Sequence, residues 1–584
     1  MTTTLYQMGP TKISISLADE EDREVIYRMR HEVYARELGQ HLENRTARLT
    51  DKLDAINVYI VAKVSEEIAG FVSITPPNEL GYSIDKYFAR EELPLTFDEQ
   101  LYETRILTVS EAWRSSRVAA LLMYAALRYI QSQGGETVVG IGRLQFLDMY
   151  KYAGFRSLQR QVRSGNVTFE LITGNVKEDY SRFRKLITDL EKHAEWKLDG
   201  IPFHEHDLVY HGGAFFEAIG EEFDHLERKG EVISADVLDA WFDPAPRVIH
   251  ALREYLPWIL RTSPPTGCEG MQRVIARSRG VNENNILPGA GSSDLIFLAL
   301  RHWLNAQSRV LILDPMYGEY AHVLEKLTGC QVERLNLSQN KNYSVQPWEL
   351  KDQLKHGYDW VILVNPNSPT GQHIHREILE DILRTAPSST RFWIDETYVE
   401  YAGLSQSLEH FAAHSTNVMI CKSMSKVYAL SGVRCAYLCG PAPMIEELRP
   451  LSPPWAVSLP GQIAACEALK SISYYQEKWQ ETHILREELS LHLQGLGWEV
   501  VPSCANFLLC HLPVDQPEVT ALVKACRKRN LFLRDVSSMG KCFDQRTLRI
   551  AVKDREKNVR MLEIIRAVLS ESEAEISQTM RVPS

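Results

Sequence analysis

The first 175 residues contain hydrophobic runs of both strand length and helix length. Two short runs, Val58–Val64 and Ile68–Ile74, are separated only by polar residues, which predicts a β-hairpin. A third run, Tyr102–Val109, predicts a strand, and the amphipathic spacing from about Ser116 to Gln133 predicts a long helix directly after it. This region is therefore expected to mix helices and strands.

From about Phe203 onward, strand-like apolar runs alternate with helical segments. The runs Val310–Leu313, Trp360–Val364 and Phe392–Ile394 are typical of buried strands, and turns rich in Gly and Pro separate them from helices. This alternation favours an α/β fold with a largely parallel sheet. Between the two regions, residues 179–197 are strongly charged with apolar positions at helical spacing, which predicts a surface or linker helix.

Composition and charge narrow the class of protein. The 584 residues are 44% hydrophobic and 24% charged, as expected for several folded units, and the net charge of -11 leaves no basic surface for nucleic acid. The N-terminus lacks the pattern of a secretory signal, and no apolar stretch approaches ~18 residues, so we expect no membrane span. The ten cysteines have no paired spacing, and no cluster has metal-ligand spacing. We expect a cytoplasmic protein with reduced thiols and no metal.

The segment Cys421–Arg434 carries the clearest chemical pattern. Small hydroxyl residues precede Lys426, and an arginine follows it eight residues later. The segment resembles the lysine signature of the class I/II aminotransferases, which use pyridoxal phosphate. The resemblance implies that Lys426 bonds to the cofactor aldehyde and later moves the proton at the substrate Cα. It also implies that Ser423, Ser425 and Arg434 hold the cofactor phosphate by charge-assisted hydrogen bonds.

Two segments further upstream fit the same resemblance. An apolar strand leads to Asp395, and Tyr398 follows; in the family this acid pairs with the cofactor ring nitrogen and the tyrosine contacts the ring hydroxyl. Taken alone, Asp395 is equally consistent with a helix cap. In Asn365–Gly371, Ser368 stands where the family commonly carries an asparagine that donates to the ring oxygen. Without the resemblance, that segment predicts only a turn.

A Gly-rich segment, Leu287–Asp294, opens an apolar helix over Leu295–Leu304, and helix N-termini attract anions. The resemblance implies that Gly291 and Ser292 belong to the phosphate cup. It also implies that Tyr317 stacks on the cofactor ring, as in histidinol-phosphate aminotransferase relatives.

Near the C-terminus, Arg549 lies in a strand-like run and matches the family's arginine for the substrate carboxylate. Arg534 is a second candidate for binding an anionic group of the substrate. It could equally be a surface arginine or form an ion pair within the protein. The resemblance covers about residues 210–575 and implies fold type I: a large α/β/α domain with a mainly parallel sheet, and a small α+β domain from about 450 to 575. His211–Gly213 resembles the start of threonine-phosphate decarboxylase. Family members are usually dimers, so a homodimer through this domain is expected.

Residues 1–175 resemble a GNAT-type acyltransferase of α+β fold, with 176–209 as the linker. Tyr150 matches the tyrosine that acts as general acid toward the leaving thiolate in some relatives, although it could simply pack. Arg117 stands where a glycine is usual. The resemblance implies acetyl-CoA as acyl donor, with its pyrophosphate on the loop residues Arg114, Ser115, Ser116, Arg117, Val118 and Ala119.

Together these resemblances imply a bifunctional biosynthetic enzyme. The C-terminal part would transfer an amino group between an amino acid and a keto acid or aldehyde, and the N-terminal part would acylate a related amine. Two alternatives stay open. The same cofactor site could catalyse decarboxylation, elimination or cyclisation, because the motifs do not report which substrate bond breaks. The GNAT unit could also be a non-catalytic binding or regulatory module.

Overall fold

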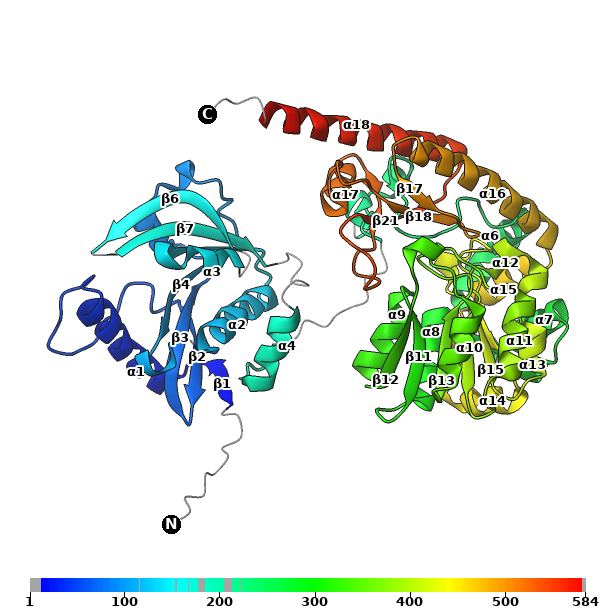
Figure 1. The fold of residues 1–584 in the computed structure, drawn as a ribbon, viewed down its shortest axis with the longest axis horizontal. Coiled ribbons are helices and arrows are strands. Elements are labelled where there is room, and N and C mark those ends of the chain that lie inside the picture. The colour runs from blue at the N-terminus through cyan, green and yellow to red at the C-terminus, as the bar shows by residue number, and fades with distance from the viewer. Residues whose placement is uncertain are drawn as a thin grey trace, which may run out of the picture. The chain divides into compact units, whose positions relative to one another are not determined.

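The computed structural model describes residues 12–114, 116–152, 155–165, 167–176, 184–203, 213–220 and 222–579. It divides the chain into two units, Met1–Leu208 and Val209–Ser584 (Figure 1). Each unit has a hydrophobic core of its own.

In the described residues, the N-terminal unit is built on an eight-stranded sheet of order β6-β7-β5-β4-β3-β2-β1-β8. The predicted hairpin is confirmed as the antiparallel pair β2–β3. The strands are β1 (Ile13–Leu17), β2 (Val58–Val64), β3 (Glu67–Thr75), β4 (Leu101–Val109), β5 (Thr137–Arg143), β6 (Arg156–Ser164), β7 (Val167–Asn175) and β8 (Ala194–Lys197). The helices are α1 (Glu20–Arg30), a π-helical turn (His31–Glu37), α2 (Val118–Ser132), α3 (Leu147–Tyr152) and α4 (Arg184–His193).

Strand β4 contains the main irregularity of this sheet. It pairs in parallel with β5 only over Leu101–Glu103, so β4 and β5 are not paired with each other beyond Glu103, although β4 stays paired with β3 and β5 with β7. On its other side the register with β3 shifts between Phe71 and Ser73, and Ile106 takes a φ of 46°. A bulge of this kind re-aims the backbone. Helix α2 follows β4, as the hydrophobic pattern predicts.

The expected linker helix is only partly correct. Helix α4 ends at His193, and Ala194–Lys197 forms β8, which pairs in parallel with β1. Leu190 and Leu198 are buried in the core of the N-terminal unit. The segment therefore completes this unit instead of only linking it onward. Residues 177–183 and 204–212, which include His211 and Gly212, lie outside the described residues.

The C-terminal unit contains a seven-stranded sheet within its described part, with the order β10-β16-β15-β14-β13-β11-β12. Only β16 runs opposite to the other strands. The predicted strands at 310–313, 360–364 and 392–394 are confirmed. The strands are β10 (Ile286–Gly289), β11 (Arg309–Asp314), β12 (Gln331–Asn336), β13 (Trp360–Val364), β14 (Arg391–Asp395), β15 (Val418–Ser423) and β16 (Ala436–Cys439).

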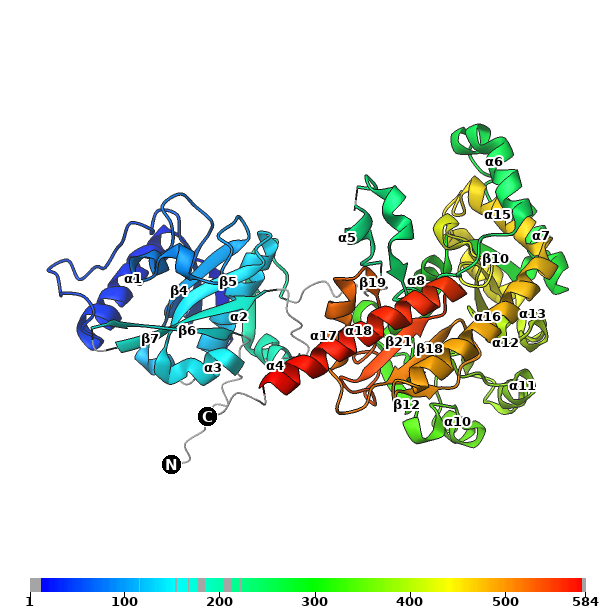
Figure 2. The ribbon, with the colours of Figure 1, turned by 90° about the horizontal axis from the view of Figure 1, so that it is seen from above.

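Helices pack around this sheet. Helix α8 contacts β10, β15 and β16, and α6 lies against α15 at the edge of the unit (Figure 2). The helices are α5 (Phe216–Ile219), α6 (Pro246–Arg261), α7 (Glu269–Arg279), α8 (Ser292–Trp303), α9 (Gly318–His322), α10 (Pro347–Leu354), α11 (Arg376–Thr385), α12 (Val399–Ala402), α13 (Glu409–Ala413), α14 (Ala442–Leu448) and α15 (Leu459–Leu469).

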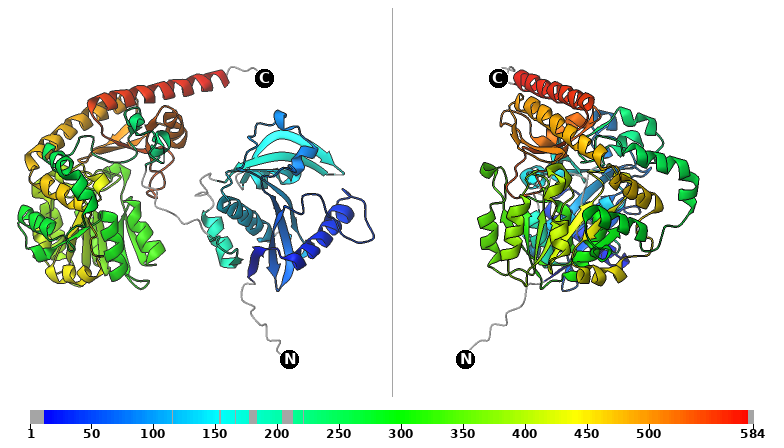
Figure 3. Two further views of the ribbon diagram at one scale, coloured as in Figure 1. Left: turned by 180° about the vertical axis from the view of Figure 1, so that it is seen from behind. Right: turned by 90° about the vertical axis from the view of Figure 1, so that its right-hand side faces the viewer.

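A second, antiparallel sheet lies within the residues expected to form the small domain. Its order is β17-β18-β21-β20, formed by β17 (Glu499–Val501), β18 (Phe507–His511), β20 (Arg534–Asp535) and β21 (Thr547–Ala551). Helices α16 (Ile472–Gln494) and α18 (Arg555–Thr579) follow one another along one face of it and contact each other (Figure 3), and α17 (Val519–Arg527) packs on α18. A short parallel pair joins β19 (Leu531–Phe532) to β9 (Ile233–Ser234), which brings the start of the unit beside its small sheet.

Among the described residues, no helix is both long and apolar enough to cross a membrane. The same residues include no group of His, Cys, Asp and Glu side chains arranged to hold a metal ion.

Candidate active site

Lys426 lies in the loop after β15 and is paired with a carboxylate from a distant part of the chain. Its Nζ is 2.7 Å from Oδ1 of Asp239, and the hydroxyl of Ser431 donates to the same oxygen at 2.6 Å. Burial alone would raise the pKa of Asp239, but Lys426 and Ser431 lower it. Sequence reasoning missed Asp239, because it lies 187 residues before Lys426 and carries no recognisable motif around it.

Asp395 is the last residue of β14, and its carboxylate is held on both oxygens. The hydroxyl of Tyr320 donates to Oδ2 at 2.8 Å, while the backbone N–H and the hydroxyl of Thr397 donate to Oδ1 at 2.9 and 2.6 Å. Burial raises the pKa of Asp395. Helix α12 begins at Val399 with Tyr398 as its N-cap residue, so the helix-cap interpretation of Asp395 is wrong. No pattern in the sequence indicated Tyr320 as a partner of this acid.

Arg549 and Ser368, which are 181 residues apart, meet in this unit. Nη1 of Arg549 donates to the Ser368 hydroxyl at 3.1 Å, and Nη2 donates to the backbone oxygen of Asp236 at 3.1 Å. Burial lowers the pKa of Arg549 to about 10. The Phe507 ring lies 5.8 Å from this guanidinium and 5.3 Å from the ring of Tyr398. Two predicted site residues, Arg549 and Tyr398, therefore pack on the same phenylalanine.

The second candidate arginine lies next to the first. Arg534 in β20 is the direct antiparallel partner of Arg549 in β21. Its positive charge contributes to the lowered pKa of Arg549, although burial is the larger cause. Two neighbouring guanidinium groups favour an anion between or beside them.

The predicted phosphate cup forms a tight cradle. Gly291 takes a φ of 102° and directly precedes helix α8, which begins at Ser292. A Cβ atom at Gly291 would lie only 2.5 Å from Nη2 of Arg434, which is exposed and comes from the loop after Lys426. Ser423 and Ser425 are buried in the same loop region, where the Ser425 N–H donates to the Ser423 hydroxyl at 3.3 Å. A helix N-terminus facing a guanidinium is a fitting place for an anion.

Tyr317 is fixed through a buried carboxylate. Its hydroxyl donates to Oε2 of Glu319 at 2.9 Å, and the hydroxyl of Ser293 at the start of α8 donates to the same oxygen at 2.9 Å. Burial raises the pKa of Tyr317 well above its ordinary value. Glu319 thus ties the predicted ring-stacking residue to the predicted phosphate cup, a link that the sequence pattern did not indicate.

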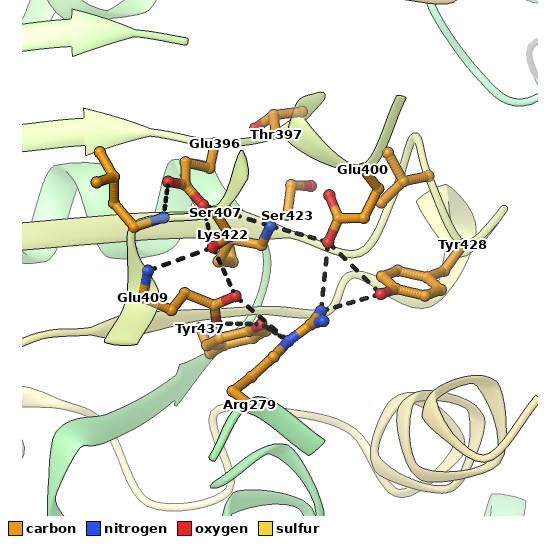
Figure 4. A network of polar contacts seen from close by, with 12 residues as sticks. Arg279, Glu396, Thr397, Glu400, Ser407, Glu409, Lys422, Ser423, Tyr428 and Tyr437 are labelled. Atoms are coloured by element: carbon orange, nitrogen blue, oxygen red, sulfur yellow. Dashed lines mark hydrogen bonds and ion pairs between the residues drawn. The ribbon is translucent and has the colours of Figure 1, made fainter. Parts of the chain in front are cut away.

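A cluster of buried charges connects the strands that carry these residues (Figure 4). Lys422 precedes Ser423 in β15, and Nζ of Lys422 lies 2.8 Å from Glu400 and 3.7 Å from Glu396, the neighbour of Asp395. Each of the paired side chains is almost completely buried. The cluster therefore joins β15, the end of β14 and helix α12.

Arg279 at the end of α7 completes the cluster (Figure 4). It lies 3.3 Å from both Glu400 and Glu409 and donates to the hydroxyl of Tyr428 at 2.9 Å. The cluster holds two cations and three carboxylates. Burial raises the pKa of Glu396 to about 7, whereas Arg279 overcomes the effect of burial and lowers the pKa of Glu409. Burial therefore favours the protonated form of Glu396, which would leave two carboxylates opposite the two cations.

In the N-terminal unit, the predicted acyl-CoA loop leads into helix α2, whose first residue is Val118. The hydroxyl of Ser116 accepts from the Val118 N–H at 3.2 Å. Arg117 is paired with Asp189 of α4 at 2.6 Å, and Arg114 is paired with Glu37 at 2.6 Å. Both arginines are partly exposed, so these pairs contribute little to stability. Ser115 lies outside the described residues, and Ala119 follows in the first turn of α2.

Tyr150 of α3 packs closely on β5. A Cβ atom at Gly142 would lie 2.5 Å from the Tyr150 ring, and Phe155 meets this ring edge-on at 6.4 Å. Burial raises the pKa of Tyr150, so the phenol keeps its proton at neutral pH. Ala153 and Gly154, which separate Tyr150 from Phe155 together with Lys151 and Tyr152, are outside the described residues.

The fold agrees with comparisons to known proteins. The chain belongs to the aminotransferase class I and II family, whose profile matches residues 239–565. A second profile, that of the acetyltransferase (GNAT) domain, matches residues 29–124.

Histidinol-phosphate aminotransferases are among the relatives of this chain. One from Gluconobacter oxydans is 28% identical over 330 residues, which cover 56% of this chain and 89% of that protein. One from Moorella thermoacetica is 24% identical over 331 residues, covering 56% and 83%.

Solved structures show the same fold. Histidinol-phosphate aminotransferase from Sinorhizobium meliloti, solved in complex with pyridoxal 5'-phosphate, aligns with a TM-score of 0.54 and 20% identity over 67% of this chain and 99% of that one. A decarboxylase from Sulfurospirillum multivorans aligns with a TM-score of 0.50 and 22% identity over 61% of this chain and 100% of that one.

Proposed function

We propose that the C-terminal unit binds pyridoxal phosphate through Lys426 and transfers an amino group between an amino acid and a keto acid or aldehyde. One observation carries this proposal. Strands β10, β13, β14 and β15 run in the same direction, and each ends at or just before a proposed site residue: Gly291, Ser368, Asp395 and Lys426. Parallel strands place ligands at this edge.

Three residues would act on the cofactor ring and on the substrate Cα. Pyridoxal phosphate, when bound, supplies an electron sink for the bonds at the substrate Cα. Asp395, held by Tyr320 and Thr397, would face the ring nitrogen with its charge fixed in direction. Tyr398 would contact the ring hydroxyl. Lys426 would take the proton from the substrate Cα and return it.

The remaining residues would bind the two ends of the cofactor and the substrate. The cradle around Gly291 fits a phosphate, because helix α8 begins directly after Gly291 and the Arg434 guanidinium lies against this glycine. Arg549 would hold the substrate carboxylate, and Arg534 would serve a second anionic group. The phosphate donors would be Gly291, Ser292, Ser423, Ser425 and Arg434, with Tyr317 on the ring face and Ser368 at the ring oxygen.

Absorption spectroscopy tests this proposal. The full chain, its Lys426→Ala variant and the control Lys470→Ala, an exposed lysine paired with Glu467, are incubated with pyridoxal phosphate and then with a panel of amino acids. We expect a visible band of lysine-bound cofactor in the wild type and the control but not in Lys426→Ala. Conversion of this band by an amino acid to the pyridoxamine form, reversed by a keto acid, supports amino transfer.

The other outcomes are equally informative. A band that is never converted to the pyridoxamine form, with carbon dioxide or another product released, would favour decarboxylation or a related reaction. The absence of a band in the wild type would refute the proposal.

We propose further that the N-terminal unit transfers an acyl group from acetyl-CoA to an amine. The GNAT profile match supports this, as does the separation of β4 from β5 beside the N-terminus of α2. Calorimetric titration of the full chain with acetyl-CoA, followed by measurement of coenzyme A release with candidate amines, tests it. Binding without release would favour a regulatory module.

We also infer a homodimer formed by the C-terminal unit. Helix α6 leaves four large apolar side chains between 45% and 72% exposed: Tyr255, Leu256, Trp258 and Leu260. Apolar patches of this kind mark protein interfaces. Sedimentation equilibrium should give a dimer for the wild type and a monomer for Trp258→Glu/Leu260→Glu.

A cytoplasmic location is consistent with the ten cysteines, which are all free thiols. Fractionation of cells that express the full chain tests it.

A further inference from the structure

The carboxylate of Asp239 lies at the reacting nitrogen of the candidate site, and no predicted role accounts for it. Asp239 belongs to the loop between β9 and α6, and its Oδ1 is 2.7 Å from Nζ of Lys426. The Ser431 hydroxyl donates to the same oxygen at 2.6 Å. Among the described residues, Oδ2 of Asp239 accepts no hydrogen bond. This second oxygen is therefore available to a further donor.

Asp239 is both held in place and reached by solvent. Its side chain is 43% exposed, and that of Lys426 is 20% exposed. Burial acts to raise the pKa of Asp239, but Lys426 and Ser431 lower it, so the group is ionised at neutral pH and can accept a proton. Because water reaches the carboxylate, such a proton can also leave it again.

The reaction proposed for this unit needs a proton acceptor at this place. At neutral pH the nitrogen of an amino acid is an ammonium group, which has no electron pair with which to attack a carbon atom. The incoming nitrogen must also come within about 3–3.5 Å of the cofactor carbon that Nζ holds. Since Oδ1 of Asp239 is 2.7 Å from Nζ, a nitrogen that approaches that carbon comes close to the same carboxylate.

We propose that Asp239 is a further catalytic residue, which accepts the surplus proton of the incoming ammonium and passes it to solvent. This inference rests on the proposed function of Lys426. The electron pair freed on the incoming nitrogen forms the new bond to carbon, and the bonds between carbon and Nζ break with their electrons remaining on Nζ. One more proton moves from the incoming nitrogen to Nζ, so Lys426 leaves as a neutral amine. In this form Lys426 can take the proton from the substrate Cα.

The test compares two nitrogen nucleophiles that differ in protonation. The full chain loaded with pyridoxal phosphate is mixed with an amino acid or with methoxyamine, and the loss of the visible band is followed by stopped flow. The nitrogen of methoxyamine is unprotonated at neutral pH, so its attack needs no proton acceptor. In Asp239→Asn, the rate at saturating amino acid should fall about 100-fold, as expected for the loss of a general base. The rate with methoxyamine should stay close to the wild-type value.

Two further variants and one binding measurement separate this role from simpler ones. Asp243→Asn removes an exposed carboxylate from the same loop and should leave both rates unchanged. Ser431→Ala keeps the carboxylate but removes the donor to its Oδ1, so it should slow the amino acid reaction by less than Asp239→Asn does. The Kd of cofactor-free Asp239→Asn for pyridoxal phosphate, measured by equilibrium dialysis, should stay near that of the wild type.

An equal loss of rate with the amino acid and with methoxyamine would overturn the inference, because it would indicate a structural role. A change confined to the half-saturating concentration of the amino acid would also overturn it, since Asp239 would then only attract the ammonium. If circular dichroism shows that Asp239→Asn is unfolded, Ser431→Ala is tested with the same two reagents. A wild-type chain without a visible band would refute the proposed function of Lys426, which is a different result.

Discussion

The guanidinium of Arg549 donates to the hydroxyl of Ser368 at 3.1 Å, which joins the predicted substrate anchor to the predicted ring-oxygen contact. A serine hydroxyl carries one proton and two acceptor positions. Because Ser368 accepts from Arg549, its own proton remains available for another oxygen. In the proposed site, serine at this position would therefore keep the donor function of the family's more common asparagine, and its hydroxyl also links to the arginine.

The first prediction concerns this link. Ser368→Ala removes the proton offered to the ring oxygen and one of the two hydrogen-bonded partners of Arg549. We expect the Kd for pyridoxal phosphate to rise about tenfold, because one hydrogen bond contributes about 1–1.5 kcal/mol. Fluorescence titration with the cofactor measures this.

Ser368→Asn is the matched variant, since the amide can donate to the ring oxygen in the same place. It should bind the cofactor more tightly than Ser368→Ala. Equal cofactor affinity in the wild type and Ser368→Ala would mean that the hydroxyl has no role in holding the ring.

The second prediction concerns the phosphate cradle. Gly291→Ala places a methyl group about where Nη2 of Arg434 now lies and forces an alanine into a φ of 102°. We expect at least about a tenfold loss of affinity for pyridoxal phosphate and a loss of roughly 1–3 kcal/mol of stability. Equilibrium dialysis with the cofactor and chemical unfolding measure the two effects.

Gly432→Ala is the control, because an added Cβ there meets no atom within 4 Å. It should leave both quantities near the wild-type values. If Gly291→Ala binds the cofactor as the wild type does, the phosphate does not occupy this cradle.

The third prediction concerns the buried charges. The pKa of Glu396 is raised to about 7, against about 4.3 for an unfolded glutamate. Between these values the folded chain holds a proton that the unfolded chain has released, so this group's contribution to stability falls as pH rises. Glu396→Gln cannot titrate. The melting temperature of Glu396→Gln minus that of the wild type should therefore be higher at pH 8 than at pH 5.

Glu409→Gln provides the contrast. Arg279 holds the pKa of Glu409 below its ordinary value despite burial, so the substitution removes a real charge. Leaving Arg279 without this partner should cost about 3–5 kcal/mol. Thermal melts of both variants across pH check this, and equal behaviour of the two glutamines would show that the proton is not held by Glu396.

The fourth prediction concerns the N-terminal unit. Because burial raises the pKa of Tyr150, the phenol is protonated at neutral pH and can donate to a leaving thiolate. Tyr150→Phe keeps the ring against Gly142, so the fold and the binding of acetyl-CoA should be preserved. The rate of coenzyme A release should fall about 100-fold. A phenylalanine variant with the wild-type rate would assign Tyr150 a packing role only.

The sequence alone sufficed for features that a short stretch of chain defines. The strands at 310–313, 360–364 and 392–394 are continuous apolar runs, and such runs are buried whatever surrounds them. Lys426, Asp395 and Arg434 lie in short segments that resemble the family's motifs. These segments were enough to predict the three residues as parts of the site. The same holds for the hairpin of β2 and β3.

Only the tertiary structure shows which distant residues contact the predicted site residues. Asp239 lies beside Lys426 across 187 residues, Tyr320 donates to Asp395 across 75, and Ala194–Lys197 pairs with the first strand of the chain. Hydrogen bonds and charges act over a few ångströms in space, whereas hydrophobic periodicity records only which face of its own element a residue occupies. Contacts between distant elements therefore leave no mark in the local pattern.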